Sequence, residues 1–235
     1  MIRRGLAAMA VVGAALSAAL APGPARAVIV GGAATFVDGV AQAAPPDGFV
    51  KLAVPFDASD PDNTVGDNTF EAPFLYGFDE NQNVIAPADI AVDIGAPVPA
   101  GRVVASHYVF IDPAQVTRLT GYVDFDAPIF GIATSRDRLI ATDFLQNNAV
   151  TYLSPSARGL ETAAQQGGTI DDSVRIDPDD PFRLLVDLQA RDPGDYVRVF
   201  TRFSPTAPVQ VPLPGAAWGL LTAAAALGLR ARRRG

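Results

Sequence analysis

Oxygen-bearing side chains crowd one short stretch of the chain, and they are of the kind that binds hard cations. Residues 57–71 carry the carboxylates that we predict as calcium ligands, namely Asp57, Asp60, Asp62, Asp67 and Glu71. Calcium takes about six to eight oxygen ligands. The spacing is not that of an EF-hand, because counting from Asp60 puts Gly66 at the seventh position instead of the sixth. Asp, Asn, Gly and Pro are also the usual residues of solvated turns, so a polar turn is the alternative.

Two further carboxylates, Asp124 and Asp126, stand two residues apart in the sequence GYVDFDAP. On a strand this spacing puts both on the same face. Paired carboxylates about 5–10 Å apart in a cleft can hydrolyse a glycosidic bond as acid and base. Their alternation with Val123 and Phe125 is more typical of the solvent face of a half-buried strand. We therefore expect a structural strand, with hydrolysis by Asp124 or Asp126 as the alternative.

The single histidine, His107, stands beside Ser106 and five residues before Asp112. A Ser-His-Asp relay needs a nucleophile on a sharp turn beside an oxyanion hole, and the sequence has no G-x-S-x-G pattern. The surrounding sequence ASHYVFID instead has the pattern of a strand. We expect His107 to be a structural hydrogen-bonding residue.

Four aromatic residues, Phe70, Phe74, Tyr76 and Phe78, fall in one short segment. Their rings could stack on sugars. Three of them, Phe74, Tyr76 and Phe78, share one face of a strand, however, and such a face usually belongs to an apolar core. We expect the core role.

Composition excludes several other chemistries. The chain has no cysteine, which rules out disulfides, zinc knuckles, thiol nucleophiles and iron–sulfur clusters, and one histidine cannot form a multi-histidine metal site. Apart from calcium, no cofactor is expected. Residues 28–203 contain 11 basic and 25 acidic residues, a net charge of −14. Such a body repels phosphate groups, so no nucleic-acid partner is expected.

The elements that must position these residues are strands. Runs rich in β-branched and aromatic residues alternate with Gly and Pro, and no stretch sustains a 3.6-residue period. This pattern predicts an all-β fold, an antiparallel β-sandwich of the jelly-roll or lectin-like kind. One short helix is expected at 141–145, where a capping residue precedes an apolar turn. The expected strands are 49–54, 90–94, 103–111, 115–125, 129–133, 173–176, 182–188 and 195–203.

The first 27 residues predict a secretory signal peptide. Arg3 and Arg4 precede an apolar run at 5–20, and Ala25 and Ala27 fit the small-x-small rule for cleavage. An amphipathic helix does not fit, because the run is apolar on every face. The Sec export machinery and signal peptidase are therefore expected partners, and Val28 is expected to begin the mature chain. Without cysteine, the chain cannot carry a lipoprotein anchor.

The other end combines a proline motif, an apolar segment and a basic cluster. The motif is Val211, Pro212, Leu213, Pro214 and Gly215, and a Pro-rich linker at 204–210 precedes it. As a helix, residues 216–229 would span about 21 Å, short of the ~30 Å hydrocarbon core. The basic residues that follow are Arg230, Arg232, Arg233 and Arg234. By the positive-inside rule they stay cytoplasmic, so this short hydrophobic helix is expected to hold the protein transiently in the inner membrane.

This three-part tail resembles the sorting signal of the PEP-CTERM class, and more narrowly its VPLPA-type variant, which exosortases of Gram-negative bacteria recognise. The match covers residues 211–234, with Gly215 in place of the alanine of that motif. The resemblance implies cleavage by an exosortase-type protease and release or transfer to the cell surface. A plain C-terminal membrane anchor is the alternative.

The body also resembles, over most of 49–204, a family of exported PEP-CTERM proteins of unknown function from cyanobacteria and proteobacteria. The resemblance is carried by NTVGDNTFEAPFLYGFDENQNV from Asn63, VVASHYVFIDP from Val103, GYVDFDAPIFGIATS from Gly121, RGLE from Arg158 and DPGDYVRVFTRFSP from Asp192. It implies no catalytic residues.

The sequence thus predicts a signal peptide at 1–27, a sandwich body at 28–203, a linker at 204–210 and a sorting signal at 211–235. The expected function is that of an exported, non-catalytic protein of the cell surface or extracellular matrix, associated with exopolysaccharide. The alternatives are a calcium-dependent carbohydrate-binding module and a hydrolase acting on polysaccharide.

Overall fold

The computed structural model describes residues 28–37, 48–153, 155–161, 172–191 and 193–203. Strands dominate these residues, and the helices are short: α1 (Arg136–Ala141) and the 3₁₀ turns η1 (Asp143–Leu145) and η2 (Pro155–Ala157). The predicted all-β class is confirmed. The predicted signal peptide, linker and sorting signal lie outside the described residues, except for Val28.

Two large sheets and one two-stranded sheet form the described part of the body. The first has the order β1 (Ile29–Phe36), β8 (Thr117–Phe125), β12 (Arg183–Ala190) and β11 (Ser173–Ile176), with antiparallel neighbours throughout. The second has the order β2 (Phe49–Lys51), β4 (Ala72–Asp79), β7 (Val103–Asp112), β13 (Asp195–Thr201), β9 (Ile129–Ala133) and β6 (Ile94–Gly95). Its neighbours are antiparallel except for β2 and β4, which run parallel. β5 (Val84–Ile85) also pairs with β7, while β3 (Thr64–Val65) and β10 (Thr151–Tyr152) form a separate parallel pair.

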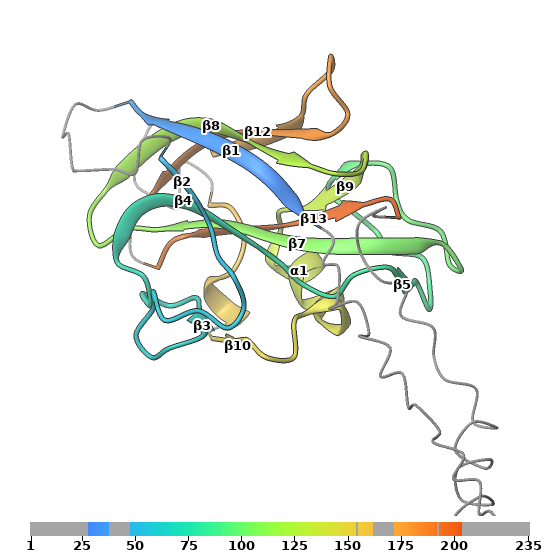
Figure 1. Cartoon of the computed structure of the whole chain (residues 1–235), viewed down its shortest axis with the longest axis horizontal. Coiled ribbons are helices and arrows are strands. Elements are labelled where there is room, and N and C mark those ends of the chain that lie inside the picture. The colour runs from blue at the N-terminus through green and yellow to red at the C-terminus, as the bar shows by residue number, and fades with distance from the viewer. Residues whose placement is uncertain (1–27, 38–47, 154, 162–171, 192, 204–235) are drawn as a thin grey trace, which may run out of the picture.

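The two sheets pack face to face, and a third layer containing α1, β3 and β10 covers the outer side of the second sheet (Figure 1). One apolar core lies between the sheets and includes Leu75, Val109 and Val123. A second core lies between the second sheet and the third layer, and includes Phe78, Tyr108 and Leu139. The second sheet is therefore buried on both faces.

Because the second sheet is buried on both faces, β13 has no solvent-exposed face. All seven of its residues are buried. Val197 and Val199 belong to the core between the sheets, whereas Tyr196 and Phe200 belong to the core under the third layer. Arg198 shares the face of Tyr196 and Phe200, so its guanidinium has to be neutralised inside the protein.

Several predicted boundaries were wrong. The strand predicted at 49–54 ends at Lys51, and the one predicted at 90–94 is reduced to a single bridge from Ile90 to Val98 followed by the short β6. Prolines at 87, 97 and 99 flank that segment and interrupt a hydrogen-bonded ladder. The short helix predicted at 141–145 is present as the 3₁₀ turn η1, but α1 directly before it was not predicted.

Five strands of the described residues were missed: the eight-residue β1 and β4, and the two-residue β3, β5 and β10. β1 has the sequence IVGGAATF, whose small residues give a weak strand signal, and β4 begins beside a proline. No helix in the described ranges is long and apolar enough to span a membrane.

Candidate functional site

The predicted calcium ligands all lie in one exposed region, but they do not converge as a set. Asp57, Asp60 and Glu71 line an open hollow of about 390 Å³, together with Asn68. Asp62 and Asp67 are exposed and do not line it. Within the described ranges, no three acidic or histidine side chains are grouped closely enough to hold a metal ion as they stand.

The donors of this hollow nevertheless fit a hard cation in chemical type. Asp57, Asp60 and Glu71 line it, and the side-chain oxygen of Asn68 is buried without a hydrogen-bond partner in the described part of the chain. Calcium prefers carboxylate and amide oxygens. Calcium binding here stays a prediction.

Of the two carboxylates considered at the end of β8, only Asp124 lies within the strand. Asp124 lies on the outer face of the first sheet, where its two oxygens accept hydrogen bonds from Arg183 Nε at 2.7 Å and Nη2 at 3.0 Å. The same guanidinium stacks over the ring of Tyr122, 4.1 Å from its centroid. Asp126 lies just beyond the end of β8, and its backbone N–H donates to the carbonyl of Val28. Asp124 is thus part of a surface ion pair.

Ser106, His107 and Asp112 do not form a relay. As neighbours on β7, Ser106 and His107 point to opposite faces of the second sheet. His107 lies 2.8 Å from Asp79 Oδ1 through Nδ1 and 3.0 Å from Thr201 Oγ1 through Nε2. Asp112 accepts hydrogen bonds from the backbone N–H groups of Thr69 and Phe70. The structural role predicted for His107 agrees with these contacts.

The four aromatic residues of the segment 70–78 belong to the protein interior, as predicted. Phe70, Tyr76 and Phe78 are buried members of the core under the third layer, and Phe74 packs against it. The rings of Phe70 and Tyr76 lie 4.6 Å apart, and those of Tyr76 and Phe110 lie 5.2 Å apart. Their faces are therefore occupied by one another.

The described part of the protein contains a fully buried ion pair that the sequence did not reveal. Arg198 on β13 and Glu80, directly after β4, both have fully buried side chains. The guanidinium binds the carboxylate through two hydrogen bonds, from Nε to Oε2 at 2.7 Å and from Nη2 to Oε1 at 2.9 Å. This bidentate geometry is the strongest form of such a pair.

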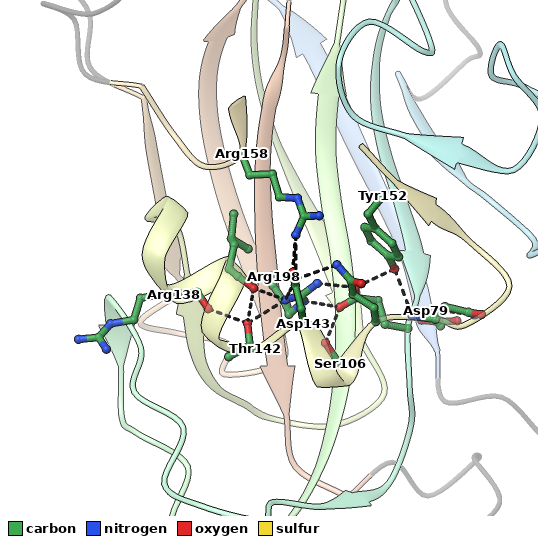
Figure 2. Close-up of polar contacts among 12 residues, drawn as sticks. Asp79, Ser106, Arg138, Thr142, Asp143, Tyr152, Arg158 and Arg198 are labelled. Atoms are coloured by element: carbon green, nitrogen blue, oxygen red, sulfur yellow. Dashed lines mark hydrogen bonds and ion pairs between the residues drawn. The ribbon is translucent and has the colours of Figure 1, made fainter. Parts of the chain in front are cut away.

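The remaining polar atoms of the pair are also bonded, as Figure 2 shows. Arg198 Nη1 donates to the carbonyl of Leu139 and to Thr142 Oγ1, both at 2.8 Å. Glu80 accepts from Ser106 Oγ at 2.6 Å and from the Tyr152 hydroxyl at 2.8 Å. The pair therefore joins the second sheet to α1, η1 and β10 of the third layer.

A second ion pair extends this cluster toward the surface. Arg158 Nη1 donates to both oxygens of Asp143, at 2.8 and 3.0 Å, and Asp143 Oδ1 also lies 3.4 Å from Arg198 Nη1. The guanidinium of Arg158 lies 5.7 Å from the ring centroid of Tyr152. Gly159, next in the chain, packs tightly, since a Cβ there would meet the carbonyl of Thr134 at 2.8 Å.

The surroundings of Arg198 favour its charged form. Burial alone would lower the pKa of Arg198, but the adjacent Glu80 carboxylate outweighs burial and raises that pKa. Burial, followed by the charge of Glu80, raises the pKa of the Tyr152 hydroxyl well above its ordinary value, so it stays a hydrogen-bond donor. Arg198 and Glu80 are thus bonded to each other and to Ser106, Thr142 and Tyr152. We call these five residues the clamp, because they join the second sheet to the third layer.

A small hollow of about 180 Å³ adjoins the clamp on its outer side. It is lined by the segment 87–91 and by Arg138, Ala141, Thr142 and Phe144 of the third layer. Figure 2 shows Arg138 directed away from Arg198. Phe144 is 46% exposed, so the hollow combines an accessible ring with charged groups at its rim.

The sequence motifs of the two termini fall largely outside the described residues. Only Val28 of the predicted cleavage site is described, next to the first residue of β1. Ala25, Ala27, the sorting motif at 211–215 and the arginines at 230 and 232–234 lie outside. Searches against protein-family models, curated proteins and solved structures find no match to this chain. The resemblance to PEP-CTERM proteins therefore stays a prediction.

Proposed function

We propose that this chain is an exported, exosortase-sorted protein of the cell surface or extracellular matrix, whose non-catalytic β-sandwich associates with exopolysaccharide. One observation carries the proposal: a signal-like segment at 1–27 and a tail at 211–235 with motif, apolar segment and basic cluster in that order enclose an acidic body. Partners of the proposal are the Sec machinery, signal peptidase, an exosortase-type protease and, transiently, the inner membrane.

The contacts of the candidate catalytic residues support the non-catalytic part of the proposal. Asp124 is held by Arg183, His107 by Asp79 and Thr201, and Ser106 by Glu80. Each side chain thus has a structural partner of its own, and the three do not converge on one hollow.

Intact mass of the protein recovered from its native host tests the proposal. We expect a chain that begins at Val28 and ends near the bond between Pro214 and Gly215, because both terminal segments are sorting signals. A mass that includes Met1 or the arginines at 230–234 would contradict the corresponding processing step.

A second candidate function, calcium-dependent carbohydrate binding, is favoured by the hollow lined by Asp57, Asp60, Asn68 and Glu71. About 10 mM calcium is then expected to raise the melting temperature by about 3–10 °C, given affinities typical of extracellular sites and preferential binding to the folded state. Asp60→Asn should abolish the rise, whereas Asp62→Asn, outside the hollow, should keep it. Equal melting temperatures in calcium and in chelator would contradict calcium binding, and the segment 57–71 would then be a polar turn. A glycan array in both conditions then tests sugar binding.

A further inference from the structure

The first strand of the body is fixed at its first residue by a polar cluster. Ile29 is 1% exposed. Its backbone N–H donates to Asp79 Oδ1 at 2.9 Å, and its carbonyl accepts from Lys51 Nζ at 2.7 Å. Directly before it, the carbonyl of Val28 accepts from the backbone N–H of Asp126. Both backbone groups of Ile29 are thus satisfied by side chains from elements far away in sequence.

Asp79, Lys51 and His107, which we call the Asp79 site, come from three different strands of the second sheet. Asp79 Oδ1 lies 2.8 Å from His107 Nδ1, and Asp79 Oδ2 lies 3.1 Å from Lys51 Nζ. Burial would raise the pKa of Asp79, but the hydrogen bond and charge of His107, the N–H of Ile29 and the charge of Lys51 together lower it. The Asp79 carboxylate is therefore ionised at neutral pH.

The side chain of Ile29 packs closely in the apolar core beside this cluster. It belongs to the core between the sheets, in register with Phe125 of β8. A Cβ at Gly77 of β4 would come within 2.8 Å of Ile29 Cδ1, so only glycine leaves the room that Ile29 fills. The ring of His107 packs on Phe125, with centroids 4.8 Å apart. Apolar contacts of its side chain and polar contacts of its backbone thus both hold Ile29, the second residue of the expected mature chain.

We propose that the Asp79 site binds the new N-terminus of the exported chain, and that cleavage after Ala27 thereby strengthens the folded body. The inference rests on the cleavage site of the proposed function. Hydrolysis of the bond between Ala27 and Val28 consumes one water and leaves a carboxylate on Ala27 and, at neutral pH, an ammonium group on Val28. Neighbouring backbone nitrogens are less than about 3.8 Å apart, so this ammonium lies within about 7 Å of Asp79 Oδ1.

The carboxylates near the new α-amino group favour its charged, ammonium form. Asp79 of β4 attracts it, and so does Asp126 directly after β8, while Lys51 of β2 repels it and His107 of β7 already shares the Asp79 carboxylate. Lys51 and the charge of His107 offset part of this attraction, but Asp79 already binds the backbone N–H of the adjacent Ile29, so we expect its attraction to prevail. An α-amino group whose folded-state pKa is raised contributes stability that is fully present below its unfolded pKa of about 7.7–8.0 and is lost as the pH rises through the folded pKa.

The test compares two recombinant chains that run to the natural C-terminus, one beginning at Val28 and one retaining Ala25–Arg26–Ala27 before it. The second keeps the contacts of Ile29 but moves the ammonium group away. At pH 7 we expect the chain beginning at Val28 to melt about 2–4 °C higher, and at about pH 10, where the ammonium is deprotonated, we expect the difference to vanish. Equal melting temperatures at pH 7, or a difference that persists at pH 10, would overturn the proposal.

A direct titration identifies the partner of the ammonium group. NMR of the labelled chain beginning at Val28 is expected to give an α-amino pKa about half to one unit above the ordinary value. Asp79→Asn should return it to that value, and Lys51→Met, which removes the competing cation and keeps Asp79, should raise it further. An ordinary pKa that neither variant moves contradicts the proposal. N-terminal sequencing of native protein separately reports whether cleavage occurs after Ala27, so failure of the processing step and failure of the binding step give different results.

Discussion

Glu80→Gln is expected to lower the free energy of unfolding by about 3–5 kcal/mol, because it leaves the fully buried guanidinium of Arg198 without its counter-charge. The amide is the same size as the carboxylate, so packing is retained. Its NH₂ group must, however, face a hydrogen-bond donor: Arg198 and Ser106 on one side, or Arg198 and Tyr152 on the other. Urea unfolding of the mature protein measures the loss.

A surface ion pair provides the matched control. Asp187 and Arg118 pair across the outer face of the first sheet, at 3.1 Å, with both side chains partly exposed. Asp187→Asn makes the same carboxylate-to-amide change and should cost about 1 kcal/mol or less, since solvent screens the exposed pair. If Glu80→Gln were no more costly than Asp187→Asn, the clamp would not be what joins the third layer to the second sheet.

The double variant Glu80→Leu with Arg198→Met separates charge from packing. Replacing both members of a buried pair by apolar residues is often far less costly than removing one. Recovery should be partial here, because Ser106, Tyr152 and Thr142 lose their partners in the clamp. Stability equal to that of the single variant would argue against the uncompensated charge as the cause of the loss.

The local sequence pattern was sufficient to predict those strands in which apolar and polar residues alternate and β-branched residues are frequent. β7, β8, β9 and β11 were predicted to within about two residues, because each strand is rich in such residues and bounded by turn formers. β1 was missed because four of its eight residues are Gly or Ala. The reason for one of these small residues is a contact between distant segments. A Cβ at Gly32 would lie 2.7 Å from the carbonyl of Tyr122 and 2.8 Å from the ring of Phe49.

The clamp could not be predicted from the sequence, because its two charges are 118 residues apart. The one local signal is the triplet of Tyr196, Arg198 and Phe200 on a single strand face, an arginine between two aromatic residues. On a sheet with one solvated face, that arginine would be exposed. It is buried because the third layer covers the second sheet, and that arrangement depends on where the segment 136–152 returns to pack (Figure 1).

The physical case for processing at the C-terminus rests on the proline motif. Pro212 and Pro214 lack backbone N–H groups and fix φ near −65°, so we expect the motif to be extended and not to continue a helix from the apolar segment. An extended segment at the membrane face suits a protease groove. By its length, the apolar segment at 216–229 is expected to dock in the bilayer but to be short for a stable span, and the arginines that follow are expected to stay on the cytoplasmic side.

Replacing Pro212 and Pro214 with alanine is therefore expected to block processing and to leave essentially all of the protein at full length in the membrane fraction of its native host. Alanine restores two N–H donors and allows the helix to extend backwards through the motif, which removes the extended segment that the protease would bind. The matched control changes Pro205 and Pro208 of the linker to alanine, two prolines outside the motif, and should be processed like the parent. Fractionation followed by intact mass distinguishes the outcomes. If the motif variant is released as readily as the parent, or if unaltered protein keeps Arg230 and the residues after it, the sorting hypothesis is wrong and the tail is a plain anchor.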